Sequence, residues 1–165
     1  MNALLRPVVE SDLTAITSIE RASFADPWTE ESFRRLLDAQ PAIFLVVESE
    51  AEGALAGYVV AFSVGEDGEI LNLAVAAPFR GRGLAGQMLD AVLIELTGRG
   101  VRAAFLEVRE SNDAARGLYG SRNFAEIGRR RGYYRRPVED AIVLRRVLEV
   151  ADEEAGRPVG TFADR

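Results

Sequence analysis

The stretch Arg80-Gly81-Arg82-Gly83-Leu84-Ala85-Gly86 decides the fold. It follows a predicted strand over residues 69–75 and opens a predicted helix over residues 83–96. At a helix N-terminus the backbone N–H groups and the helix dipole favour an anion. Glycines let the backbone approach a phosphate closely, and Arg80 and Arg82 could add charge-assisted hydrogen bonds. We therefore predict a phosphate-binding loop over residues 80–86.

The same glycines also spell a competing motif. Gly81, Gly83 and Gly86 match the G-x-G-x-x-G pattern of dinucleotide-binding folds, and Glu107 lies about where a ribose-binding acid is expected. In that motif the first glycine follows the strand almost directly, whereas residues 76–80 intervene here. The strands before the loop are joined by short connections, which indicate antiparallel pairing. The context favours a phosphate loop; an ordinary glycine-bearing turn is the simplest alternative.

Outward from the loop, hydrophobic periodicity predicts one mixed α/β (α+β) domain over residues 1–150. We expect a mostly antiparallel twisted sheet flanked by helices, with Ser11 or Asp12 capping the first helix and Thr29 the second. Residues 151–165 are polar and without periodicity, so we expect a flexible tail. The predicted order is β-α-α-β-β-β-α-β-α-β-β, with strands over residues 4–8, 43–48, 55–62, 69–75, 103–108, 124–129 and 141–147.

The composition limits the chemistry. The 165-residue chain has no cysteine or histidine, and all 20 basic residues are arginine. Thiolate nucleophiles, Schiff bases and metal sites built on Cys or His are therefore excluded, and acid–base work falls to carboxylates, tyrosines, the N-terminus or water. The carboxylates are not clustered with ligand spacing, so we predict no metal site.

Charge and hydropathy indicate the setting. The net charge of −6 argues against nucleic-acid binding, and we interpret the arginines at 129–131 as a solvated strand face. No run approaches the roughly 20 apolar residues of a membrane span, and there is no secretory signal. We expect a cytoplasmic protein with no membrane or nucleic-acid partner. The sequence leaves the oligomeric state open, with a monomer favoured.

Residues 75–86 resemble motif A of the Gcn5-related N-acetyltransferases, and the predicted element order is similar to that fold. Four further stretches are similar to the RimI branch of this family: residues 24–33 (FADPWTEESF), 106–112 (LEVRESN), 117–119 (GLY), and the tyrosine pair 133–134 followed by residues 139–142 (EDAI). The likeness extends over about residues 4–147. Members of that branch acetylate the N-terminal alanine of small-subunit ribosomal protein eighteen.

The resemblance implies acetyl-CoA as cosubstrate and a protein N-terminus as partner. Glu107 then occupies the family's general-base position and Tyr119 its general-acid position. The remaining implied positions bind the cosubstrate: Leu73, Ala74 and Val75 contact the acetyl-pantetheine arm through backbone groups, Gly81, Arg82, Gly83, Leu84, Ala85 and Gly86 hold the pyrophosphate with Arg80, and Asn112 binds CoA.

The residues allow alternatives for both catalytic roles. Glu107 could be an outward strand residue or pair with Arg109, and Glu110 is a competing base. Tyr119 lies two helical turns after Asn112, on the same helix face, but could be an ordinary core tyrosine.

Amine chemistry and the aromatic residues of the chain indicate the kind of acceptor. An α-amine has a pKa near 8 and a lysine one near 10.4, so an α-amine needs less help from a base. Trp28, Tyr133 and Tyr134 could wall a peptide groove, and Glu139 and Asp140 could offer negative charge to a basic peptide. The alternatives are a small-molecule amine or a protein lysine as acceptor, a non-catalytic CoA-binding sensor and, remotely, a nicotinamide oxidoreductase.

Overall fold

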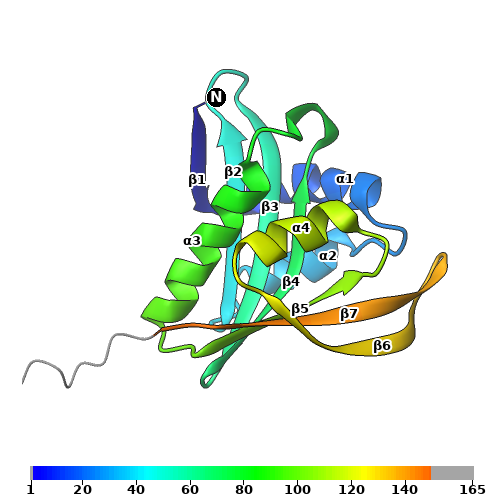
Figure 1. Ribbon diagram of the computed structural model, residues 1–165. Coiled ribbons are helices and arrows are strands. Elements are labelled where there is room, and N and C mark those ends of the chain that lie inside the picture. Colours follow the sequence, from blue (N-terminus) through cyan, green and yellow to red (C-terminus); the bar gives the residue numbers. More distant parts are fainter. Residues whose placement is uncertain (1, 150–165) are drawn as a thin grey trace, which may run out of the picture.

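The computed structural model describes residues 2–149 (Figure 1). Its elements follow the predicted order, so the mixed α/β architecture is confirmed. Two 3-10 turns, Glu10–Asp12 and Ala77–Phe79, precede the first and third α-helices. The tail predicted for residues 151–165 lies outside the described residues.

Seven strands form one sheet in the order β1-β2-β3-β4-β5-β7-β6. Every neighbouring pair is antiparallel except β4 and β5, which are parallel. Short hairpins join β2 to β3, β3 to β4 and β6 to β7, while α3 provides the crossover that the parallel pair requires. The strands are β1 (Ala3–Pro7), β2 (Ala42–Ser49), β3 (Ala54–Val64), β4 (Asp67–Val75), β5 (Ala103–Arg109), β6 (Ala125–Arg135) and β7 (Val138–Val147).

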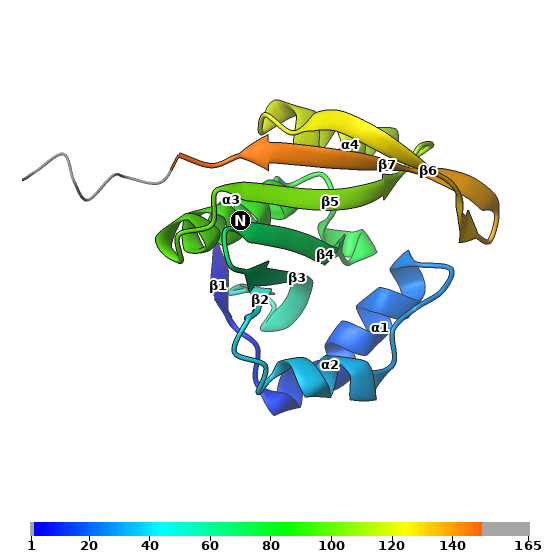
Figure 2. The same cartoon turned by 90° about the horizontal axis from the view of Figure 1, so that it is seen from below.

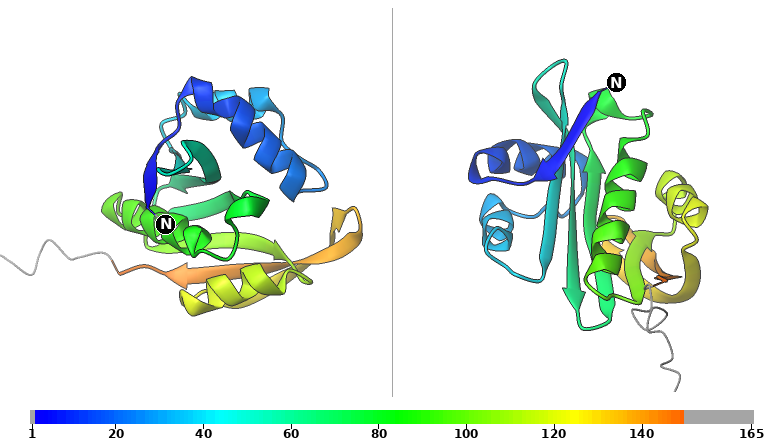
Figure 3. Two further views of the ribbon diagram at one scale, coloured as in Figure 1. Left: turned by 90° about the horizontal axis from the view of Figure 1, so that it is seen from above. Right: turned by 90° about the vertical axis from the view of Figure 1, so that its left-hand side faces the viewer.

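Four helices cover the two faces of the sheet (Figure 2, Figure 3). Helices α1 (Leu13–Ser23) and α2 (Glu30–Leu36) lie on one face, and α3 (Leu84–Gly98) and α4 (Asp113–Ser121) lie on the other. Each face therefore has a hydrophobic core of its own.

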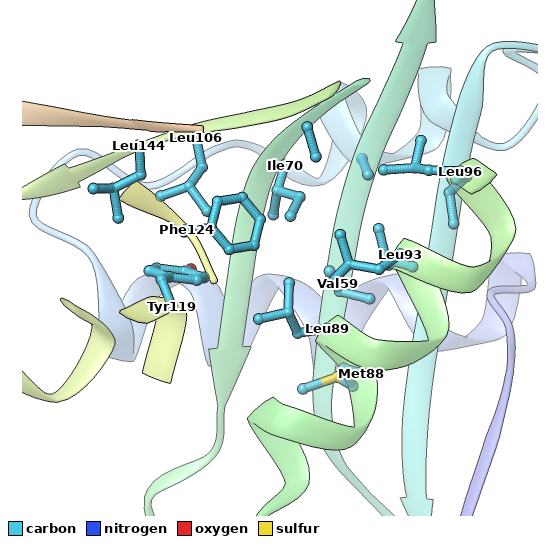
Figure 4. Close-up of a cluster of buried hydrophobic side chains, with 14 of the residues drawn as sticks. Val59, Ile70, Met88, Leu89, Leu93, Leu96, Leu106, Tyr119, Phe124 and Leu144 are labelled. Carbon is cyan, nitrogen blue, oxygen red and sulfur yellow. The ribbon is translucent and has the colours of Figure 1, made fainter. Parts of the chain in front are cut away.

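The two cores differ in character. Under α3, aliphatic side chains at helical spacing, such as Leu89 and Leu96, are fully buried against the sheet (Figure 4). Under α1 and α2 a cluster of three aromatic rings lies among aliphatic side chains: the Phe33 ring centroid is 5.8 Å from that of Phe44 and 5.5 Å from that of Tyr58. Burial of these large rings holds the short helix α2 on the sheet.

Strand β4 is paired on both sides along its first half only. Its first four residues pair with the first four of β5; beyond them, among the described residues, β4 pairs with β3 alone. Val60 faces Asn72 while Ala61 faces Ile70, which leaves Leu71 as the extra residue of a β-bulge. The second half of β4 thus has an edge whose backbone groups are available to another chain or ligand.

The predicted caps have different outcomes. Thr29 caps α2 as predicted, because its side chain accepts a hydrogen bond from the Ser32 N–H at 3.2 Å. The prediction for α1 is wrong: Asp12 occupies the N-cap position but makes no side-chain cap bond. Its carboxylate instead pairs with Arg6 at 2.7 Å and accepts the Val9 N–H at 2.9 Å.

Strand β6 is longer than the predicted strand over residues 124–129, since it runs to Arg135. It forms a long hairpin with β7 whose pairing is interrupted between Arg130 and Tyr134. Gly132 lies in this irregular part with φ of 59°, and its N–H donates to Asp140 at 2.9 Å. The irregularity breaks the alternation that sequence reading uses. The arginines at 129–131 are exposed on this strand, as predicted.

Candidate active site

A groove of about 590 Å³ opens beside the unpaired half of β4. The end of β5 and the start of α4 contribute to it, and its walls come from the α1–α2 connection and the β6–β7 hairpin. Figure 2 shows these two segments approaching from opposite sides. The groove brings together the two residues predicted for catalysis and the three aromatic residues predicted for the acceptor: Glu107, Tyr119, Trp28, Tyr133 and Tyr134.

Tyr119 belongs both to the core and to the groove. Its side chain extends from α4, is 8% exposed, and packs edge-on to Phe124 with ring centroids 5.7 Å apart (Figure 4). Burial, reinforced by Tyr134, raises the pKa of Tyr119 to about 12. Among residues 2–149 its hydroxyl has no hydrogen-bond partner. The group therefore keeps its proton at neutral pH and can donate it within the groove.

Glu107 reaches the groove because successive side chains of a strand point to opposite faces of the sheet. Its neighbours Leu106 and Val108 are buried in the core, so the Glu107 side chain, 19% exposed, projects from the opposite face of β5. It pairs with the Nε of Arg130 at 2.6 Å. The alternative pairing with Arg109 is wrong.

Arg109 is held elsewhere. It pairs with Glu139 at 3.2 Å and lies over the Tyr134 ring, with its guanidinium carbon 4.3 Å from the ring centroid. These contacts fix the hairpin against the end of β5 and leave the Glu107 carboxylate facing the groove.

Aromatic side chains line both walls. Trp28, half-buried, packs against Phe33 with ring centroids 5.5 Å apart. Across the groove, Tyr133 and Tyr134 meet edge-to-face at 5.1 Å. A hydrogen bond to Glu107 raises the pKa of Tyr133, and burial raises that of Tyr134 to about 12. The walls thus combine apolar surface with neutral hydroxyl donors.

The glycine loop continues directly from β4 into α3. Gly81 and Gly83 have φ of 76° and 78°, a left-handed conformation that other residues adopt at a cost. Residues Leu84, Ala85 and Gly86 form the first turn of α3, and within the described chain no side chain caps it. The N–H groups of this turn are those predicted to hold a phosphate, and that role stays a prediction.

The two loop arginines brace the loop. Arg80 donates from Nε to the Val75 carbonyl at 3.0 Å, and Arg82 donates to the Pro78 carbonyl at 3.1 Å. These bonds hold the turn closed at the base of the anion site, a role that the sequence did not indicate.

The other predicted cosubstrate positions lie along the same path. Leu73 lines the groove, Ala74 points into the core under α1, and Val75 leads into the loop. Asn112 also lines the groove, and its side-chain oxygen caps α4 by accepting the Ala115 N–H at 3.1 Å.

Three predicted acidic residues lie outside the groove lining. Glu110 pairs with Arg129 at 2.6 Å. Hydrogen bonds from the Ser111 side chain and from its backbone N–H, the latter at 2.5 Å, lower the pKa of Glu139. Asp140 accepts the Gly132 N–H in the irregular part of β6. Glu110 is therefore a poor competitor for the role of base, and the other two acids serve the hairpin.

Sequence reasoning missed the acids that do line the groove: Glu20, Asp26 and Glu69. Only Glu20 gave a signal. It follows Ile16 and Ile19 on the buried side of α1, where a charged residue is unusual.

The glycine loop at the start of α3, the half-open β4 strand and a groove lined by Glu107 and Tyr119 fit an acyltransferase site of the GNAT type. The chain belongs to the acetyltransferase (GNAT) family, whose model matches residues 13–124. It is 37% identical to a putative [ribosomal protein bS18]-alanine N-acetyltransferase of Bacillus subtilis over 86% of this chain and 93% of that protein. It is 36% identical to the [ribosomal protein bS18]-alanine N-acetyltransferase of Salmonella typhimurium over 81% of this chain and 90% of the relative.

Among solved structures, the ribosomal-protein-S18-alanine N-acetyltransferase of Escherichia coli superimposes with a TM-score of 0.83 at 30% identity, covering 93% of this chain and 98% of the other. Within residues 2–149, no helix is long and apolar enough to cross a membrane. The same part of the chain contains no group of three acidic residues that could hold a metal ion.

Proposed function

We propose that this enzyme transfers the acetyl group of acetyl-CoA directly to the N-terminal α-amine of a protein, and that the acceptor is the N-terminal alanine of ribosomal protein bS18. The observation that carries the proposal is the groove itself. It places a carboxylate, Glu107, and a buried neutral hydroxyl, Tyr119, beside the unpaired half of β4. Both are the residue types that amine acetylation needs.

The site fits acetyl-CoA. The uncapped first turn of α3 offers backbone N–H groups to the pyrophosphate through residues 81–86. The unpaired edge of β4 at residues 73–75 offers backbone groups to the pantetheine arm in the manner of an added strand. Asn112 would use its amide nitrogen, since its oxygen already caps α4. Bound acetyl-CoA supplies an activated thioester carbonyl.

The chain's own residues manage two protons. Glu107 accepts a proton from the acceptor amine, directly or through a water, as the amine nitrogen forms its bond to the acetyl carbon. Tyr119 donates its hydroxyl proton to the sulfur as the C–S bond breaks. Backbone N–H groups at the β4 bulge stabilise negative charge on the carbonyl oxygen. Glu107 then returns its proton to solvent, and Tyr119 regains one. These steps require no metal ion.

Two arguments support an α-amine acceptor. The relatives compared above carry the name [ribosomal protein bS18]-alanine N-acetyltransferase, which for the Bacillus subtilis protein is a putative assignment. The groove also has acidic groups and aromatic walls, which suit the start of a basic peptide. A ribosomal acceptor implies a cytoplasmic location. Small-molecule amines, protein lysines and a purely CoA-binding role remain the alternatives to be tested.

The experiment is an acceptor panel in which CoA release is followed with acetyl-CoA. The panel contains a peptide beginning Ala-Arg with a basic continuation, its N-terminally blocked twin, a lysine peptide and several small amines. We expect turnover with the free peptide and none with the blocked twin. Turnover with the small amines alone would reject the ribosomal acceptor. Tight acetyl-CoA binding without turnover on any acceptor would favour the sensor.

A further inference from the structure

Glu20 of α1 is a buried carboxylate without a cationic partner. The residue is 1% exposed, and among residues 2–149 no arginine contributes to its electrostatics. Its two oxygens accept hydrogen bonds from the Trp28 backbone N–H at 3.0 Å, from the Asn72 amide at 3.1 Å each, and from the Tyr58 hydroxyl. Burial raises the pKa of Glu20, and the bonds from Trp28 and Asn72 oppose that change.

The three donors belong to three different elements. Trp28 lies in the α1–α2 connection, Asn72 on β4 next to its bulge, and Tyr58 on β3. Trp28 and Asn72 both line the groove, one on its wall and one at its floor. Glu20 therefore joins the wall that receives the acceptor to the strand that receives the thioester.

A simple core role does not explain this residue. An apolar side chain would fill the position in α1 without the cost of burying a charge. Three donors that converge on one carboxylate fix the position of each donor, because any displacement leaves a buried polar group unpaired.

We propose that Glu20 is a positioning residue that holds the Trp28 wall and Asn72 in register, so that the acceptor amine meets β4 at a fixed point. This inference rests on the proposed function, since it assigns the acceptor side of the same groove. Glu20 acts through Trp28 and Asn72.

The decisive variant is Glu20→Gln. Glutamine keeps the size of the side chain but offers one acceptor oxygen instead of two. Its NH₂ group must then face the N–H of Trp28 or the amide of Asn72, both of which are donors. We expect the wall to loosen while the cosubstrate path along the glycine loop stays intact.

The matched control is Asp12→Asn. Asp12 lies at the other end of α1, is also a buried carboxylate at 6% exposure, and also accepts a backbone N–H. It is not part of the groove lining. It reports the general cost of removing a buried charge from this helix.

Two readouts test the proposal. The first compares the KM for the Ala-Arg peptide with the KM for acetyl-CoA. We expect Glu20→Gln to raise the peptide KM by about tenfold and to leave the acetyl-CoA KM within about twofold. The second is acrylamide quenching of Trp28, the only tryptophan of the chain. Quenching should increase in Glu20→Gln and stay unchanged in Asp12→Asn.

A second variant protects the test if Glu20→Gln does not fold. Tyr58→Phe removes one donor without emptying the core, and it should raise the peptide KM in the same direction by a smaller factor. The proposal is overturned if the variants that fold leave both the peptide KM and Trp28 quenching at wild-type values. It is equally overturned if both KM values rise together, or if Asp12→Asn gives the same changes. Failure of wild type to acetylate any α-amine rejects the proposed function, while Trp28 quenching still decides whether Glu20 orders the wall.

Discussion

Replacement of Tyr119 by phenylalanine separates its two roles. The ring packs edge-on against Phe124 and is almost fully buried, whereas the hydroxyl lines the groove and bonds to no described residue. Tyr119→Phe therefore removes the proton donor and keeps the packing. We expect the free energy of unfolding to stay within about 1 kcal/mol of wild type, because no internal hydrogen bond is lost.

The expected kinetic effect follows from the role of the hydroxyl. Proton transfer by a positioned side chain contributes roughly 10²–10⁴-fold to rate. We expect kcat of Tyr119→Phe to fall by about 10²–10³-fold, which corresponds to about 3–4 kcal/mol of transition-state stabilisation. The peptide KM should change little, since in the proposed mechanism the hydroxyl acts on the departing sulfur rather than on the acceptor.

The assay is CoA release at saturating peptide and acetyl-CoA, together with a thermal melt. Tyr134→Phe is the matched variant, because burial also raises the pKa of Tyr134 to about 12 but its place is the acceptor wall. We expect it to affect the peptide KM rather than kcat. With a pKa of about 12, Tyr119 stays protonated through pH 10, so its ionisation should not lower the wild-type rate below that pH. The reasoning is refuted if Tyr119→Phe retains kcat within about threefold of wild type.

Four further outcomes follow. Glu107→Gln should lower kcat by about 10²-fold or more with a native melt, measured by CoA release. Gly83→Ala should cost about 1 kcal/mol through its φ of 78° and weaken acetyl-CoA binding in calorimetry, whereas Gly53→Ala, at φ of 62°, should cost the same stability without changing affinity. Phe33→Ala should lower the free energy of unfolding in urea by about 3–5 kcal/mol, because a fully buried ring leaves a cavity. The hydrogen bond from Arg6 lowers the pKa of Asp12 from 3.8, so this carboxylate stabilises the folded state above about pH 4 and loses that effect as pH falls. Asp12→Asn should therefore flatten the acid limb of a curve of unfolding free energy against pH.

The elements of the fold were predictable because their signals are local. Helical spacing in α3, the Thr29 cap and the glycine loop each depend on residues within a few positions of one another. The errors occurred where a distant partner decides the outcome. Asp12 pairs with Arg6 of β1 instead of capping its own helix. Strand β6 pairs with β7 through a bulge, which breaks the alternation of polar and apolar residues in the sequence.

In the candidate site, too, some residues could be predicted from the sequence and others depend on distant partners. Glu107 and Tyr119 could be chosen from motifs, and the structure places both in one groove. That Arg130, rather than Arg109, pairs with Glu107 depends on the register of β5, β7 and β6, which sequence patterns do not specify. Glu20 depends on three donors 8, 38 and 52 residues away, so composition and spacing alone carry little information about it.

The chain has no histidine and no lysine, so the groove relies on carboxylates and tyrosines, and burial sets the pKa of the tyrosines. The two kinds of group have different surroundings in the groove. Burial keeps Tyr119 and Tyr134 neutral, whereas Glu107 is partly exposed and pairs with Arg130. No side chain with a reference pKa near 7 is present to take a proton from a strongly basic amine. At neutral pH a lysine acceptor has roughly two orders of magnitude less neutral amine than an α-amine. With Glu107 and Tyr119 in their proposed roles, the site would therefore serve an α-amine well and a lysine poorly, and its chemistry, independently of its relatives, favours a protein N-terminus as the acceptor.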